Sequence, residues 1–180
     1  MPEDLEQFYA RYPEIVFSYM KMRSQFYPDT LVEGFARLAA RRPGLGLVLC
    51  GVAGHMEGGV WPKVQADIAR HGLTDRIAIV DDLPHEAFMT ALGRSHVCLR
   101  TPTSDGVSSS VLESLALGVP VVAAENDSRP AGVVTYPAED PEALARAVGD
   151  VLERRDEIAA SLPKLEVRDT LTEEAAVLTR

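Results

Sequence analysis

The chain has 180 residues, 46% of them hydrophobic and 25% charged, as in an ordinary globular protein with one well-filled core. Its net charge of -9 comes from the two ends, because residues 15–124 carry equal numbers of acidic and basic residues. Without a basic stripe, a nucleic-acid backbone is not expected as a partner. No apolar run approaches 18 residues and the start of the chain is acidic, so we expect neither a membrane span nor a secretory signal. Cys50 and Cys98 lie in apolar, strand-like runs and are interpreted as reduced core thiols, which favours a cytoplasmic protein.

Short apolar runs alternate along the chain with stretches of helical periodicity. The predicted strands are residues 15–20, 45–51, 76–83, 96–102, 120–124 and 131–137. The predicted helices are residues 29–42, 61–72, 84–94, 110–117 and 141–154, with a possible last helix at 171–179. We expect a leader or linker at 1–14, one domain at 15–155 and a helical extension at 156–180.

Strands that are apolar on both faces and alternate with helices indicate a parallel sheet covered on both sides. The expected fold is therefore α/β, a Rossmann-like doubly wound parallel sheet of about six strands with helices on both faces. In such sheets ligands bind beyond the carboxyl ends of the strands. Four predicted loops share that rim, and the loop after the fourth strand, "TPTSDGVSSS", is the most informative.

In this loop Asp105-Gly106 is a turn signal, and Ser108, Ser109 and Ser110 lead into the next helix. Backbone N–H groups at a helix start have no partner within the helix, so they could hold a phosphate or diphosphate. A structural interpretation is also open. Ser110 and Glu113 have the spacing of a capping box, and Asp105-Gly106 could be a surface turn only.

The segment "TPTSDGVSSSVLESLALGVPVVAA" resembles the carboxylate-x7-carboxylate segment of retaining GT-B glycosyltransferases, the group that includes sucrose and glycogen synthases. Asp105 and Glu113 match its two acids, with Asp in place of Glu at the first. The other matching positions are Gly106, Leu112, Ala116, Gly118, Pro120, Val121 and Val122, and Ser114 stands in place of Ala. The resemblance extends over about residues 15–155 and implies the nucleotide-sugar-binding C-terminal half of a GT-B fold.

The resemblance also implies roles. Glu113 would accept hydrogen bonds from the ribose of a nucleoside diphosphate, and the amides of Ser108, Ser109 and Ser110, with Gly106, would hold the diphosphate. Asp105 would contact hydroxyls of the donor sugar and, as a catalytic residue, stabilise the positive charge that develops at the anomeric carbon. Such transferases need no metal and no cofactor, use a nucleotide sugar as substrate and serve in polysaccharide biosynthesis. The acceptor is held by an N-terminal domain, so this chain would need that domain or a partner subunit, and would be nearly inactive alone.

The family's cations after the first strand follow a Gly-Arg pair, whereas this chain has Ser18-Tyr19 there. Lys21 and Arg23 are the candidates to neutralise the leaving diphosphate, and the alternative is that they are solvated loop cations.

The other candidates come from the remaining rim loops. Gly51 and Gly54 would let the backbone approach the ligand, or would serve a plain turn. Asp82 and Leu83 would border the base. Further possible contacts are His55 to a phosphate, and Arg100 and Arg129 to the cleft. Neither cysteine has a His or Cys partner at ligand spacing, so no metal site is expected.

Three other classes of function compete with this interpretation. A non-catalytic interaction or regulatory domain could keep this fold. A receiver-like signalling domain is suggested by "IVDDLP" at 79–84, but the acidic pair follows the wrong strand and no Lys lies between Lys63 and Lys164. A dinucleotide oxidoreductase is disfavoured because no G-x-G-x-x-G joins a strand to a helix.

Overall fold

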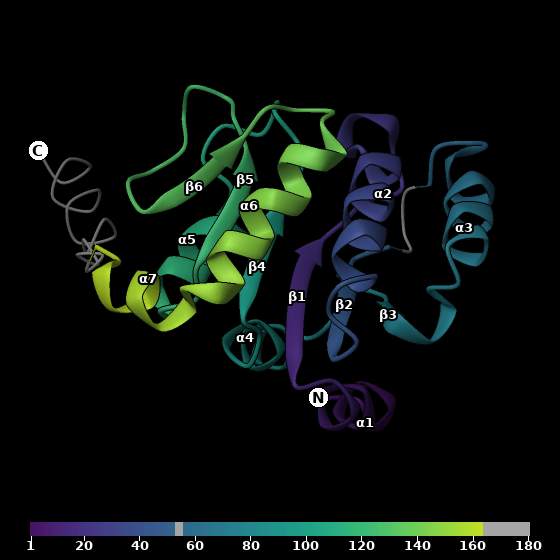
Figure 1. Ribbon diagram of the computed structural model, residues 1–180, viewed down its shortest axis with the longest axis horizontal. Helices are drawn as coiled ribbons and strands as arrows, with labels where there is room; N and C mark the ends of the chain where they lie inside the picture. The colour runs from purple at the N-terminus through teal and green to yellow at the C-terminus, as the bar shows by residue number, and fades with distance from the viewer. Residues whose placement is uncertain (53–55, 164–180) are drawn as a thin grey trace, which may run out of the picture.

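The computed structural model describes residues 1–52 and 56–163, which form a six-stranded parallel sheet between layers of helices (Figure 1). The strand order is β3-β2-β1-β4-β5-β6, and every neighbouring pair is parallel. The strands are β1 (Glu14–Tyr19), β2 (Leu45–Cys50), β3 (Ile77–Val80), β4 (Val97–Arg100), β5 (Val121–Ala124) and β6 (Val133–Tyr136). The predicted Rossmann-like sheet is confirmed, and each predicted strand is found within three residues of its expected ends.

Helices cover both faces of the sheet because successive strand residues bury side chains on opposite sides. In β1, Val16 belongs to the core under α2, α3 and α6, and Phe17 to the core under α1, α4 and α5. The helices are α1 (Glu3–Arg11), α2 (Pro28–Ala39), α3 (Val60–Arg70), α4 (His85–Gly93), α5 (Ser109–Ala116), α6 (Pro141–Glu153) and α7 (Arg155–Ser161).

The N-terminal segment contains a helix that the sequence analysis did not predict. Leu5 and Tyr9 of α1 are buried in the core, and the Tyr9 hydroxyl lies 2.8 Å from the carbonyl oxygen of Ala91 and 2.9 Å from Ser95 Oγ. Leu5, Phe8, Tyr9 and Tyr12 have helical spacing, so the signal was present, although strongly acidic surroundings obscured it. The possible helix at 171–179 lies outside the described residues.

The order of the sheet places a crevice between β1 and β4. From β1 the chain winds outward through β2 to β3, and from β4 it winds the other way through β5 to β6. The connecting loops therefore diverge where β1 and β4 end, and this switch point is where ligands bind in open α/β sheets. Within residues 1–52 and 56–163, no helix is long and apolar enough to cross a lipid bilayer.

Candidate functional site

Helix α5 begins at the rim of the switch point, directly after the loop that leaves β4. Its N-cap is Ser108, and the expectation of a capping box between Ser110 and Glu113 is wrong. The helix begins one residue earlier than predicted. Ser108 has the extended backbone of an N-cap residue (φ -72°, ψ 137°), and Ser110 is already inside the first turn. In the described part of the chain the Glu113 carboxylate makes no hydrogen bond, so it is available to a ligand.

The three serines at this helix start differ in burial and in the partners of their hydroxyl and N–H groups. The hydroxyls of Ser108 and Ser110 are buried and lie 3.0 Å apart, whereas Ser109 is exposed. The backbone N–H groups of Ser109 and Ser110 have no acceptor in the regions that the structure describes. These two donors, at the positive end of the helix dipole, suit an anion.

A hollow of about 340 Å³, here called the α5 hollow, lies in front of these N–H groups. It is lined by Tyr19, Leu83, His85, Phe88, Arg100, Ser108, Ser109, Ser110 and Glu113. The Tyr19 and Phe88 rings meet edge to face, with centroids 6.3 Å apart. The hollow thus combines an apolar wall, amide donors, one carboxylate and one guanidinium. Of these residues, the sequence analysis missed Tyr19, His85 and Phe88, because single aromatic or histidine residues within a strand or helix carry no motif of their own.

Asp105 is held by two buried arginines. Arg100 Nε lies 2.7 Å from Asp105 Oδ2, and Arg129 Nη1 lies 3.3 Å from Oδ1. The side chains of Arg100 and Arg129 are 7% and 3% exposed, so these are interior ion pairs. Arg129 also donates to the carbonyl oxygens of Ala124 and Pro102, which ties the Asp105 loop to the end of β5.

Burial affects the charged state of Arg129. Its desolvation lowers the pKa of the guanidinium, and the neighbouring Asp105 carboxylate opposes that shift. Both arginines therefore support the first acid of the motif, and Arg100, as the sequence suggests, also lines the α5 hollow.

A second hollow of about 390 Å³, the β1 hollow, adjoins the first. It is lined by Lys21, Arg23, Gln25, Phe26, Pro102, Ser104 and Asp105. Lys21 Nζ lies 5.3 Å from the centroid of the Tyr19 ring and 3.8 Å from Asp82 Oδ2. Because Tyr19 borders the α5 hollow and Arg100 contacts Asp105, the two hollows meet at these side chains. The structure thus brings Lys21, Arg23 and Asp105 together, next to the Ser108–Ser110 segment.

The remaining sequence candidates lie around the hollows. Gly51 has a φ of +83°, and a Cβ there would come within 2.6 Å of the Tyr19 ring, so its small size serves the packing of Tyr19. Gly106 forms the turn after Asp105 with a φ of +56°. Asp82 is exposed beside Lys21, and Leu83 lines the α5 hollow. Gly54 and His55 lie outside the described residues.

Two observations concern metals and thiols. Among residues 1–52 and 56–163, no group of three His, Cys, Asp or Glu side chains is arranged to hold a metal ion. Both cysteines are buried and unbonded to each other, and burial raises the pKa of each thiol to about 11.

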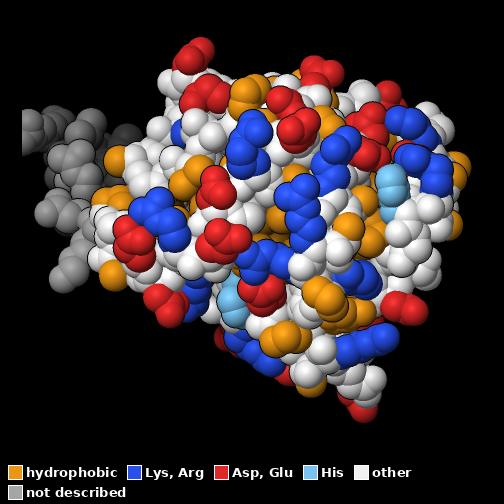
Figure 2. Space-filling model, viewed as in Figure 1, with side chains coloured by type: hydrophobic (Ala, Val, Ile, Leu, Met, Phe, Trp, Pro, Cys, Tyr) orange, Lys and Arg blue, Asp and Glu red, His pale blue; other side chains and the backbone are white. Residues whose placement is uncertain are grey.

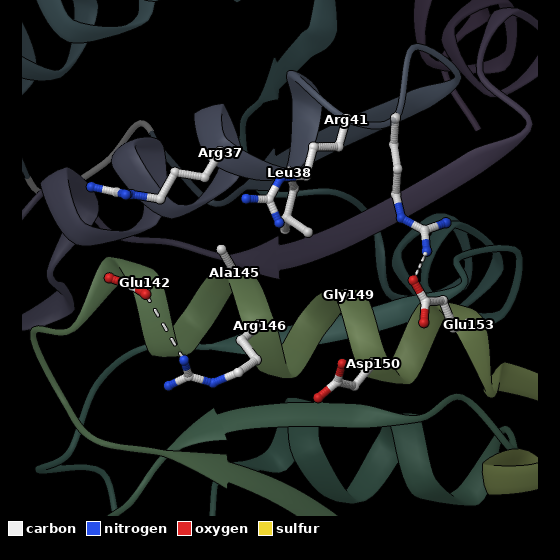
Figure 3. Close-up of a pocket in the computed structure, with 10 residues that line it drawn as sticks. Arg37, Leu38, Arg41, Glu142, Ala145, Arg146, Gly149, Asp150 and Glu153 are labelled. Carbon is white, nitrogen blue, oxygen red and sulfur yellow. Dashed lines mark hydrogen bonds and ion pairs between the residues drawn. The ribbon is translucent and has the colours of Figure 1, made fainter.

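A larger hollow of about 590 Å³ lies elsewhere, on the outer surface between α2 and α6 (Figure 3). Acidic and basic side chains are interspersed over this face of the molecule (Figure 2). Arg42 contacts Glu14 and Glu153 at 3.0 and 3.1 Å, and Arg146 lies 4.0 Å from Glu142. Since these acidic groups already pair with arginines, we place the candidate site at the switch point instead.

Comparison with known families decides the class of protein. The sequence profile of the family described as "Glycosyl transferases group 1" matches residues 6–165. The chain belongs to this family. No match is found among curated protein sequences.

Solved structures of glycosyl transferases have the same fold. Anabaena HepE in complex with UDP-glucose is similar with a TM-score of 0.74 and 18% identity, over 91% of this chain and 47% of HepE. The C-terminal domain of the group 1 protein LpcC from Francisella tularensis is similar with a TM-score of 0.74 and 12% identity, over 89% of this chain and 88% of that domain. An α,α-trehalose-phosphate synthase (UDP-forming) from Burkholderia xenovorans is similar with a TM-score of 0.71 and 14% identity, over 88% of this chain and 40% of the synthase.

At these identities the likeness shows the fold. This group 1 domain spans less than half the length of HepE and of the synthase, whereas it spans nearly all of the isolated LpcC domain.

Proposed function

We propose that this glycosyl transferase group 1 domain binds a nucleoside-diphosphate sugar and serves in retaining, metal-independent glycosyl transfer. One observation carries the proposal: the N–H groups of Ser109 and Ser110 and the carboxylate of Glu113 border the same hollow at the switch point. A nucleoside diphosphate offers an anion to such N–H donors and a pair of ribose hydroxyls to such a carboxylate.

The nucleoside occupies the α5 hollow in this proposal. Glu113 accepts hydrogen bonds from the two ribose hydroxyls, since an ionised carboxylate offers only acceptors. Leu83 and Phe88 provide the apolar wall against the base, and the amides of Ser109 and Ser110 bind the diphosphate.

The donor sugar occupies the β1 hollow. Asp105 has one acceptor site left on each oxygen beyond its arginine contacts, and it binds a sugar hydroxyl. Lys21 and Arg23 border the same hollow and supply positive charge to the leaving diphosphate, the role of cations in a transfer without metal.

We infer that the domain corresponds to the C-terminal half of a two-domain GT-B enzyme. The coverage of HepE and of the LpcC C-terminal domain supports this, and it implies an acceptor-binding domain in the same or a partner chain. The 180 residues alone would then bind donor and transfer little sugar. Two buried, unbonded cysteines support a cytoplasmic location.

Calorimetric titration of the chain with UDP, GDP and ADP tests the proposal. We expect heat of binding with at least one of them, and UDP is the first choice because it is the nucleotide bound to HepE. No heat with any of the three on folded protein would reject nucleotide binding.

The alternative, a non-catalytic interaction domain, is favoured by one observation: both oxygens of Asp105 are engaged by arginines. Under that alternative Glu113→Ala would leave every measurable ligand affinity unchanged.

A further inference from the structure

The Arg100 guanidinium is fixed in position by four neighbours. Its Nε donates to Asp105 Oδ2 at 2.7 Å and its Nη1 donates to the carbonyl oxygen of Tyr19 at 2.9 Å. Its central carbon also lies 5.2 Å from the centroid of the Phe26 ring and 5.9 Å from that of Tyr19. The plane of the guanidinium is thereby set before any ligand arrives, which lowers the entropic cost of binding.

The cluster around Arg100 has an uncompensated positive charge. Arg100 and Arg129 share the single carboxylate of Asp105, so the three side chains carry a net charge of one. Glu125, the other acid that acts on Arg129, is exposed and accepts hydrogen bonds from the backbone N–H groups of Asn126 and Asp127 instead. Glu113 borders the α5 hollow, as Arg100 does, but makes no ion pair with Arg100 within the described residues, so the buried excess of positive charge is costly unless an anion joins it.

Arg100 lines the α5 hollow and has one nitrogen that remains available. Arg100 is the one Lys or Arg side chain among the described residues that lines it, and Nη2 makes no hydrogen bond within the described part of the chain. The N–H groups of Ser109 and Ser110 border the same space, whereas Lys21 and Arg23 border the β1 hollow.

We propose that Arg100, from the end of β4, binds the diphosphate of the donor together with the amides at the start of α5. Arg129 acts as a positioning residue, because it holds Asp105 without lining the same hollow. Asp105, besides its proposed contact with the donor sugar, orients Arg100. This assignment rests on the proposed function. It adds a phosphate-binding cation on β4 to Lys21 and Arg23 after β1, and it explains how Tyr19 can stand where the family has an arginine.

The test compares affinity for a nucleoside diphosphate with affinity for the matching nucleoside. UDP, GDP and ADP are titrated first, and the tightest of them is used with wild type, Arg100→Gln and Arg100→Lys. We expect Arg100→Gln to weaken diphosphate binding roughly tenfold to a hundredfold, the range for loss of charge-assisted hydrogen bonds, and to leave nucleoside binding near the wild-type value. Lysine keeps the charge but not the planar pair of donors, so the diphosphate affinity of Arg100→Lys should lie between those of wild type and Arg100→Gln.

Arg129→Gln is the matched control, since it also removes a buried guanidinium from Asp105 but does not line the hollow. Its effect on diphosphate affinity should be smaller than that of Arg100→Gln. Equal diphosphate affinities in wild type and Arg100→Gln would overturn the assignment, and so would equal losses for nucleoside and diphosphate. Failure of the wild type to bind any of the three nucleotides would instead refute the proposed function itself.

A spectroscopic measurement keeps the assignment testable if Arg100→Gln does not fold. The Nε–H resonance of Arg100, identified by its absence in Arg100→Lys, should shift when the nucleoside diphosphate is added and stay in place with the nucleoside. An unmoved resonance at saturating diphosphate would also overturn the assignment.

Discussion

Arg100 Nε and Asp105 Oδ2 lie 2.7 Å apart across a five-residue turn, in a region where both side chains are largely shielded from water. The first acid of the motif is therefore part of an interior ion-pair cluster as well as a wall of the β1 hollow. Its substitution should affect stability and ligand binding together.

Asp105→Asn tests the stability side of this relationship. The change leaves Arg100 and Arg129 without a counter-charge, and we expect the free energy of unfolding to fall by about 2–4 kcal/mol. Urea unfolding measures it, and Asp150→Asn, an exposed carboxylate on α6, is the control. Unfolding curves that coincide for wild type and Asp105→Asn would show that the cluster contributes nothing to the fold.

Glu113→Gln tests the ligand side at nearly constant shape. The Glu113 carboxylate borders the α5 hollow and makes no hydrogen bond within the described residues, so its replacement should leave stability close to wild type. Loss of the charged acceptor should weaken nucleoside diphosphate binding about tenfold in calorimetry. Glu142→Gln, on the distant α6 surface, should bind as wild type does. An unchanged affinity for Glu113→Gln would support the non-catalytic alternative.

Gly51→Ala should disturb Tyr19 and, through it, both hollows. The added Cβ would sit 2.6 Å from the ring at a backbone φ of +83°, which we expect to cost about 1–3 kcal/mol of stability. Gly58→Ala is the matched control, because a Cβ at Gly58 would meet nothing within 4 Å. Thermal unfolding compares the two, and equal melting temperatures would contradict the packing role of Gly51.

The buried thiols make stability depend on alkaline pH. Burial raises the pKa of Cys50 and Cys98 to about 11, from about 9 in the unfolded chain. Their contribution to stability is therefore complete below about pH 9 and is lost as pH rises toward 11, because the unfolded thiols ionise first. Urea unfolding across this window should show the decline, and a Cys50→Ala/Cys98→Ala variant should show a shallower one. A slope that is the same in both proteins would exclude the thiols as its cause.

The sheet could be predicted because each strand is a short apolar run with breakers at both ends. The run at 45–51, for example, is buried along its whole length, and such burial leaves a clear sequence pattern. Helix α1 was not predicted because the acidic residues of its first turn, Glu3, Asp4 and Glu6, surround Leu5 and are typical of a solvated leader.

The sequence motif of the site could be predicted, but the arginine contacts that hold Asp105 could not. Asp105, the serines and Glu113 follow one another in sequence, whereas the partner of Asp105 on the other side, Arg129, is 24 residues away. Nothing local distinguishes such an arginine from a surface one. The exact start of α5 was also open, because three consecutive serines have equal preference for the N-cap position.

The meeting of β1 and β4 at the switch point has a consequence for folding. Phe17 of β1 pairs with Cys98 of β4, so the two sides of the crevice come from strands some 80 residues apart along the chain. Neither half of the sheet can form the crevice by itself, and a donor bound there would contact both halves and stabilise their association. Occupancy would then suppress their separation, so that protease resistance of the β1–β4 seam becomes a reporter of ligand.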